Sequence, residues 1–113
     1  MLIDIKKVKI IVTVPLKNVE DVRKAMCEAG AGVIGNYSFC TTATKSIGTF
    51  IPNENAKPHI GKKGKLEFVK EDKLEAVCDL LNVKQVITKI REVHPYEEPT
   101  IDIVPLLDEE ILN

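Results

Sequence analysis

The sequence lacks the features that mark several large classes of protein. Its 16 basic and 17 acidic side chains leave a formal net charge of −1, which argues against the basic excess of a nucleic-acid or membrane-surface binder. No apolar run approaches the ~20 residues that a transmembrane helix requires. The three cysteines have no paired spacing, and the chain begins at Met1-Leu2-Ile3-Asp4 without a basic region or a cleavage site. We therefore expect a cytoplasmic protein that binds neither nucleic acid nor membrane.

What the chain does contain is a globular composition. Hydrophobic residues make up 44% and charged residues 29% of its 113 residues, and no linker, repeat or low-complexity stretch divides it. A chain of this length is able to bury roughly two-thirds of its surface on folding. We therefore interpret residues 1–113 as a single domain.

The first 30 residues predict one strand followed by one helix. Apolar and polar residues alternate from Lys7 to Val14, which is typical of a strand, and Pro15 ends it. Asn18 is a suitable N-cap for the helix that follows, and Gly30 supplies its C-terminal stop. The helix carries one apolar stripe for packing on a sheet, which consists of Val19, Val22, Met26 and Ala29.

The middle of the chain is rich in residues that favour strands. Asn36–Thr44 and Ile47–Pro52 predict a hairpin, with Lys45-Ser46 between them as its turn. Residues 53–64 form a polar loop, and a third extended stretch begins near Lys65. Residues 69–81 have helix-favouring composition but alternate near their middle, so the local pattern leaves helix and strand open and we favour strand for part of them.

The last third predicts a second helix and a last strand. Asn82 is an N-cap, and the helix ends at His94 because Pro95 disfavours a helical predecessor. Its apolar stripe consists of Val83, Val86, Ile87 and Ile90. With Thr100–Val104 as the final strand, the order β-α-β-β-α-β predicts an α+β fold, the ferredoxin-like split βαβ, with two helices on one face of an antiparallel sheet.

The other face of that sheet must be solvated or covered by another subunit. Apolar residues assigned to this second face favour a covering subunit and hence a homo-oligomer; they are Ile11, Tyr37, Phe39 and Val104.

Two glycine-rich segments resemble phosphate-binding loops, but their context is wrong. Gly30–Gly35 spells G-x-G-x-x-G, yet it follows a predicted helix and leads into a strand, the reverse of a dinucleotide fingerprint. We interpret it as a helix cap and turn. Gly61–Lys65 is a basic turn without the Walker spacing, so a solvated turn is favoured over the anion site of a small phosphate hydrolase.

The hexapeptide His94–Pro99 is the most unusual segment. It places an imidazole, a phenol and two carboxylates close together, and such groups ligate metals or exchange protons near neutral pH. The structural alternative, which we prefer, is that His94 and Pro95 end the helix while Tyr96 packs at a subunit or sheet edge. The metal hypothesis would use His94 with Glu97 or Glu98, joined by His59 across an interface. The cysteines lack zinc-site spacing, and buried small hydrophobes are the favoured interpretation for Cys27 and Cys78.

Several linked motifs together resemble one known module. They are, in chain order, Gly30–Cys40, Gly48–Pro52, Ala56–Gly61, Gly64–Glu67 and His94–Glu98. From about Val8 to Leu106 the chain resembles the domain inserted in bacterial members of the Nif-three-like family (NGG-interacting factor, dinuclear metal centre proteins). The string from His94 to Glu97, with Pro99, is also similar to the end of the CutA divalent-cation-tolerance proteins, whose subunits have a PII-like fold and assemble as trimers.

The resemblance implies a PII/CutA-like fold, a strand over residues 65–80 and a homo-oligomer. The trimer is the oligomeric state that it favours. The resemblance also implies a non-enzymatic module that binds a small ligand or a partner at clefts between subunits, with divalent-metal binding as the alternative. The family's metal ligands lie in flanking segments that these 113 residues do not include, so neither that chemistry nor a cofactor is carried over. Tryptophan is absent and the central hairpin differs from that of CutA, so cation tolerance is not carried over either.

The expected ligand cleft lies where the turn after the first helix meets the turn after the second. Each turn joins a helix to a strand, and we expect both at the same end of the split βαβ. The candidate ligand-binding residues are Gly32, Gly35, Asn36, Tyr37, His94, Tyr96, Glu97 and Glu98. The candidate metal ligands are His94, Glu97 and His59.

Overall fold

The computed structural model describes residues 3–107 and 109–112. Its strands are β1 (Lys7–Pro15), β2 (Thr42–Phe50), β3 (Glu67–Asp79) and β4 (Ile101–Leu106). Its α-helices are α1 (Val19–Glu28) and α2 (Val83–Val93), and short 3₁₀ turns span Leu16–Asn18, Leu80–Asn82 and Glu109–Leu112.

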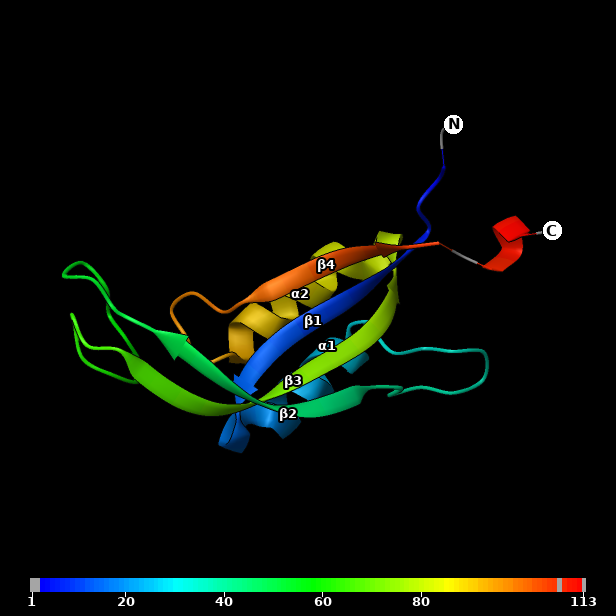
Figure 1. Ribbon diagram of the computed structural model, residues 1–113. Coiled ribbons are helices and arrows are strands. Elements are labelled where there is room, and N and C mark those ends of the chain that lie inside the picture. The colour runs from blue at the N-terminus through cyan, green and yellow to red at the C-terminus, as the bar shows by residue number, and fades with distance from the viewer. Residues whose placement is uncertain (1–2, 108, 113) are drawn as a thin grey trace.

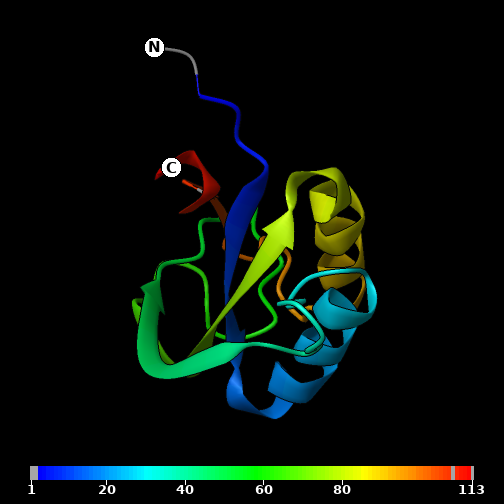
Figure 2. The same ribbon diagram turned by 90° about the vertical axis from the view of Figure 1, so that its right-hand side faces the viewer.

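The strands form one antiparallel sheet in the order β2-β3-β1-β4. Both helices lie against the same face of this sheet, as the two views show (Figures 1 and 2). This arrangement confirms the predicted split βαβ of the ferredoxin-like plan. No helix among residues 3–107 and 109–112 is both long and apolar enough to cross a bilayer.

The core lies between the sheet and the helices. Alternation along β1 directs Val8, Ile10, Val12 and Val14 toward the helices, and all four are at most 2% exposed. The antiparallel register places Cys78, Ala76 and Leu74 of β3 beside the first three of these residues. The predicted helix stripes complete the cluster through Val19, Val22, Met26, Val83, Val86 and Ile90. One apolar face of β1, β3, α1 and α2 is therefore buried, as the periodicity predicts.

The predicted hairpin turn at Lys45-Ser46 is wrong. Residues 42–50 form one continuous strand, and residues 36–41 lie outside β2. Among the described non-glycine residues only Phe39 has a positive φ, so neither Lys45 nor Ser46 adopts the left-handed conformation that tight hairpin turns use. The actual hairpin joins β2 to β3 through residues 51–66.

The sequence left helix and strand open for residues 69–81, and the structure shows that residues 69–79 form a strand. β3 spans Glu67–Asp79 and is paired with β1 on one side and β2 on the other. Its alternation buries Leu74, Ala76 and Cys78, while Glu75 and Val77 between them face away from the core. Burial of one face therefore outweighs the helix-favouring composition.

Both helices begin where predicted, but by a different mechanism. Asn18 and Asn82 occupy the N-cap positions, yet neither side chain makes a capping hydrogen bond. Each asparagine instead ends a 3₁₀ turn that leads directly into its helix. The Asn18 side-chain oxygen is buried and has no hydrogen-bond partner among the described residues. The tight 3₁₀ turn therefore starts each helix without a side-chain cap.

The predicted second-face set is half correct. Ile11 pairs with Glu75 and Asp102 on the face away from the helices, and Val104 pairs with Lys9 on that face. Tyr37 and Phe39 are not on the sheet, because they lie in the exposed segment between α1 and β2.

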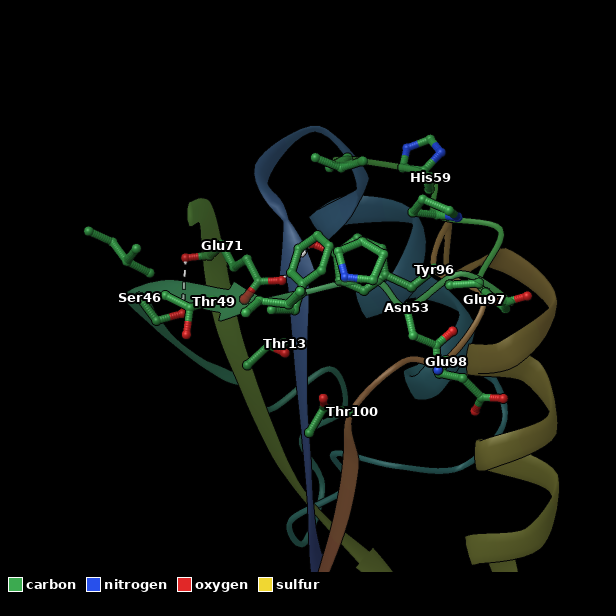
Figure 3. A pocket seen from close by; sticks show the side chains of 18 of the residues that line it. Thr13, Ser46, Thr49, Asn53, His59, Glu71, Tyr96, Glu97, Glu98 and Thr100 are labelled. Carbon is green, nitrogen blue, oxygen red and sulfur yellow. Dashed lines mark hydrogen bonds between the residues drawn. The ribbon is translucent and has the colours of Figure 1, made fainter. Parts of the chain in front are cut away.

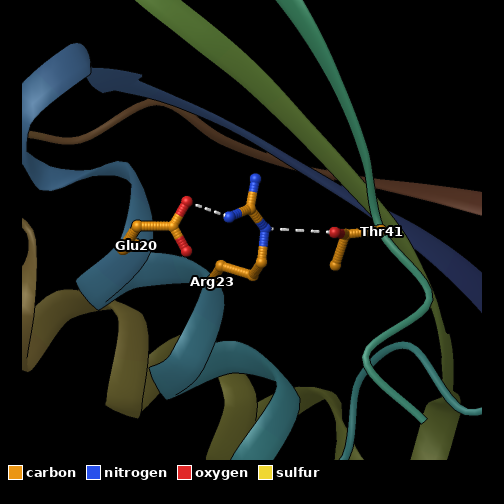
Figure 4. Close-up of polar contacts among 3 residues, drawn as sticks. All are labelled: Glu20, Arg23 and Thr41. Carbon is orange, nitrogen blue, oxygen red and sulfur yellow. Dashed lines mark hydrogen bonds and ion pairs between the residues drawn. The ribbon is translucent and has the colours of Figure 1, made fainter.

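A polar contact fixes the end of the segment between α1 and β2. Arg23 Nε of α1 donates to Thr41 Oγ1 at 3.2 Å, and its guanidinium also pairs with Glu20 (Figure 4). The contact ties α1 to the residue that precedes β2, so the entry into that strand is held against the helix layer.

Matched leucine substitutions test the position of the core. Leu74 is 0% exposed and Leu81 is 96% exposed. We expect Leu74→Ala to lower the free energy of unfolding by about 2–5 kcal/mol, because it leaves a cavity between sheet and helices. Leu81→Ala should change it by less than about 0.5 kcal/mol. Urea unfolding measures both, and equal effects would contradict the assigned core.

Candidate functional site

A cavity of about 790 Å³ lies beyond the end of β1. β3 has 13 residues and β1 has 9, and the last β1 pair is Pro15 with Glu71, so residues 67–70 of β3 pair with β2 alone. We call residues 46–71 the hairpin arm, which extends past the helices in Figure 1. The cavity lies between this arm and the turn that follows α2 (Figure 3).

Tyr96 connects the turn to the arm. Its hydroxyl donates to Glu71 Oε2 at 2.7 Å, and its ring centroid lies 6.4 Å from that of Phe50 with the planes tilted by 52°. Burial raises the pKa of the Tyr96 phenol well above its ordinary value, and the hydrogen bond to Glu71 and its negative charge raise this pKa further. Tyr96 therefore remains a protonated donor throughout the neutral range.

Glu71 is the cavity residue that the sequence patterns missed. It is 6% exposed, and its side chain lies over Gly48 of β2. A Cβ at position 48 would overlap with Glu71 Oε1, so a side chain there would have to displace the carboxylate. Glycine in the middle of a strand is itself a sequence signal for such a close approach, but it does not name the approaching residue. The register of β3 against β2 places Glu71 opposite Ser46, so its carboxylate reaches Gly48 diagonally on the same face.

His94 is part of the fold beside the cavity. It is 7% exposed; its Nε2 lies 2.8 Å from the Thr13 carbonyl, and its Nδ1 accepts a hydrogen bond from the Tyr96 backbone N–H at 3.2 Å. These partners require the neutral ring with its proton on Nε2. Burial lowers the pKa of His94, although the Thr13 carbonyl and the Glu71 charge oppose this shift. Both ring nitrogens are thus occupied in holding the turn against β1.

The remaining residues of the hexapeptide line the cavity. Glu97 Oε1 accepts a hydrogen bond from the Lys57 backbone N–H at 3.1 Å, which joins the turn to the arm. Glu98 and His59 also contribute to the wall. Within the described part of the chain, no three His, Cys, Asp or Glu side chains gather in a way that could hold a metal ion. A metal site from His94, Glu97 and His59 stays a prediction, and it would require His94 to give up a hydrogen bond.

The turn after α1 lies at the opposite end of the sheet, so within one subunit the two turns do not form the expected common cleft, and a cleft between subunits stays a prediction. Gly32 N–H donates to the Val77 carbonyl at 2.8 Å, near the end of β3, whereas His94 meets Thr13 near the end of β1. β1 and β3 are antiparallel, so the helices that follow these two strands end at opposite ends of the sheet, along the strand direction. Consequently the segment between α1 and β2, which contains Gly32, Gly35, Asn36 and Tyr37, is remote within one subunit from the turn after α2, which contains Tyr96 (Figure 1).

The thiols agree with the structural interpretation. Cys27 and Cys78 are buried in the core cluster, and burial raises the pKa of both. A thiol with a raised pKa is a poor nucleophile at neutral pH.

The sequence matches a part of longer curated proteins. It is 46% identical over 101 residues to the GTP cyclohydrolase 1 type 2 homolog of Halalkalibacterium halodurans, and 46% identical over 98 residues to that of Bacillus subtilis. These alignments cover 89% and 87% of this chain but only 27% and 26% of the relatives. The chain therefore spans about a quarter of the length of the curated relatives it matches. No family model matches it.

Solved structures show the same relationships. The Bacillus cereus protein related to NIF3 superposes with a TM-score of 0.81 at 38% identity, covering 95% of this chain and 27% of that one. The periplasmic divalent cation tolerance protein CutA of Archaeoglobus fulgidus gives a TM-score of 0.65 at 20% identity, and the alignment covers 94% of this chain and 91% of that one. The second match establishes the fold alone. The resemblance to the Nif-three-like module and the CutA-like fold is confirmed.

The burial of His94 predicts a pH dependence of stability. Its pKa in the folded state lies below the ordinary 6.5, so the unfolded chain binds a proton first as the pH falls. Stability is therefore lost as the pH drops below about 6.5, until the folded-state pKa is reached. We expect urea unfolding at pH 7.5 and 5.5 to show a smaller difference for His94→Gln than for the unsubstituted protein. His59→Gln, at an exposed position, should retain most of the difference, because the His59 charge is the smallest of the causes that act on the His94 pKa.

The Tyr96–Glu71 bond predicts a coupling between these residues. Tyr96→Phe leaves Glu71 Oε2 without its donor, which should lower the free energy of unfolding by about 1–3 kcal/mol. In a Glu71→Gln background the cost should fall to about 1 kcal/mol, since the lost hydrogen bond is then between neutral groups. Tyr37→Phe, at a residue that is 75% exposed, is the matched control. Equal costs of Tyr96→Phe in both backgrounds would show that no such coupling exists.

Proposed function

We propose, from the homology of this chain to about a quarter of the Nif-three-like proteins, that it is a non-enzymatic, oligomeric module that binds a small molecule in the cavity. The supporting observation is the cavity itself, whose wall combines the end of β1, both strands of the hairpin arm, the loop between them and the turn after α2. At about 790 Å³ it falls in the range of small-molecule sites.

The lining suits recognition of a small molecule. Thr13, Ser46 and Thr100 supply hydroxyl groups, and Asn53 and Asn55 supply amides, for hydrogen bonds. Phe50, Pro52, Pro58 and Ile60 supply apolar surface. A few polar groups on a largely apolar wall fix the orientation of a bound ligand and exclude water from its remainder.

A binding role is favoured over catalysis by the internal bonds of the titratable groups. The phenol of Tyr96 donates to Glu71, and the imidazole of His94 is held at both nitrogens. A proton transfer by either group would break a bond that holds the turn in place. The name of the curated relatives refers to proteins about four times as long as this chain, and we assign no GTP chemistry to these residues.

The assembly that we propose is a homo-oligomer, and the trimer is the oligomeric state that we favour. On the sheet face away from the helices, Ile11 and Val77 are only partly buried within the subunit and Val104 is exposed. The hairpin arm adds exposed apolar side chains, namely Ile47, Ile51, Leu66 and Phe68. Exposed apolar surface of this kind is typical of contacts between subunits.

Native mass spectrometry of untagged protein tests both parts of this proposal. We expect a trimer that carries the added mass of a small molecule. Gly48→Val should keep the trimer but lose the added mass, because a side chain at position 48 displaces Glu71 at the cavity wall. A bare monomer would contradict the assembly, and a trimer of the unsubstituted protein without added mass would contradict ligand retention.

A further inference from the structure

Glu71 is a buried carboxylate without a positively charged partner. Its Oε2 accepts the Tyr96 hydroxyl, but Oε1 accepts no hydrogen bond from any residue that the structure describes. Within the same residues Glu71 forms no ion pair, since the salt bridges found there join Glu20, Glu28 and Glu92 to basic residues of their own helices. A buried carboxylate without a counter-charge is unfavourable, so its persistence beside a cavity points to a cationic ligand.

The rest of the cavity wall carries the same sign of charge. Its other carboxylates are Glu97 and Glu98, its remaining titratable groups are His59 and Tyr96, and no lysine or arginine lines it. Figure 3 shows Glu71 on the strand side of the cavity and Glu97 and Glu98 on the turn side. Lys70 and Lys73, the nearest basic residues along β3, are exposed and outside the lining. A cleft lined by one sign of charge concentrates ligands of the opposite sign.

Two features leave Glu71 Oε1 accessible and free to accept a hydrogen bond. The Tyr96 hydroxyl occupies Oε2 and thereby fixes the orientation of the carboxylate. Gly48 has no side chain where a Cβ would overlap with Oε1. The second oxygen of Glu71 is therefore held in place with its lone pairs unused.

The aromatic residues beside Glu71 favour an organic cation over a metal ion. Phe50 and Tyr96 lie with tilted planes on the cavity wall, and aromatic rings attract ammonium groups. A divalent metal ion would require several oxygen or nitrogen ligands, but Glu97 Oε1 already accepts the Lys57 N–H and no suitable group of three exists among the described residues. An alkylammonium ion needs one carboxylate, nearby hydroxyls and an apolar wall, all of which are present.

We propose that the cavity binds a small alkylammonium compound, whose charged nitrogen donates to Glu71 Oε1 and whose carbon chain lies against Phe50 and Tyr96. This inference rests on the proposed small-molecule function of the cavity and specifies the chemical class of its ligand. Thr13, which lines the same cavity, accepts a further ammonium proton through its hydroxyl. Glu71 is the residue that determines specificity for a cation.

Three probes of equal chain length and different charge test the proposal: n-butylammonium, 1-butanol and butyrate. Titrations of the ¹⁵N-labelled full chain are followed through the backbone amides of Gly48, Glu71 and Tyr96. We expect n-butylammonium to bind about tenfold more tightly than 1-butanol, as a hydrogen bond to a charged group contributes about 1.5–3 kcal/mol against about 1 kcal/mol for a neutral one. Butyrate should bind most weakly.

Two matched variants assign the preference to Glu71. Glu71→Gln keeps the size of the side chain. In this variant n-butylammonium should bind about as weakly as 1-butanol, and the affinity for 1-butanol should not change. Glu75→Gln removes the same charge four residues further along β3, outside the cavity lining, and should retain the preference. If Glu71→Gln fails to fold, Gly48→Ala provides the second variant, since its Cβ obstructs Oε1 and should lower the n-butylammonium affinity about tenfold.

The outcomes separate this inference from the function on which it rests. Absence of saturable binding by all three probes would overturn the small-molecule cavity itself. Binding of 1-butanol or butyrate as tightly as n-butylammonium would preserve the cavity and overturn the cation. A preference that survives Glu71→Gln would overturn the role of Glu71.

Discussion

The pairing of β1 with β3 is the constraint on which the rest of the structure depends. It aligns the buried faces of both strands, and because β3 is longer it extends four residues beyond the last pair, Pro15 with Glu71. That excess length creates the hairpin arm, and the arm supplies most of the cavity wall. Glu71 stands where the support of β1 ends, so its side chain reaches the cavity while its backbone is still part of a three-strand region. One register therefore determines both the core and the position of the buried carboxylate.

Short-range patterns predicted the elements that have one buried face. Alternation along β1 and the apolar stripes of α1 and α2 identified their inward residues, because each pattern reflects burial of a single side. The same reasoning failed at Lys45-Ser46, where a change of composition inside one exposed edge strand was interpreted as a turn. Few residues of β2 are buried, so its sequence carries little information about where the strand begins or ends.

The candidate site was predictable only in part, for a topological reason. The hexapeptide drew attention to Tyr96, Glu97 and Glu98, which do line the cavity, because a phenol and carboxylates held by prolines are unusual in any context. Glu71 looked like an ordinary charged residue of an alternating strand, and nothing local distinguishes it from Glu75. Its role follows from the glycine across the strand pair and from a tyrosine 25 residues away, and such neighbours become visible only with the register. The antiparallel direction of β1 and β3 likewise separates the two turns that sequence reasoning placed together.

The strand order has a consequence for how the chain folds as it is synthesised. β1 is made first, yet its neighbours β3 and β4 lie some 60 and 90 residues further along the chain. Until both have emerged, an alternating strand of valine and isoleucine has two open edges, and closing such long loops is slow. The lysines at positions 7 and 9 lie on this strand and oppose its association with similar strands of other chains. This strand order places the most apolar strand, β1, in the middle of the sheet. The nascent chain therefore depends on the lysine charges of β1 to avoid association with other chains.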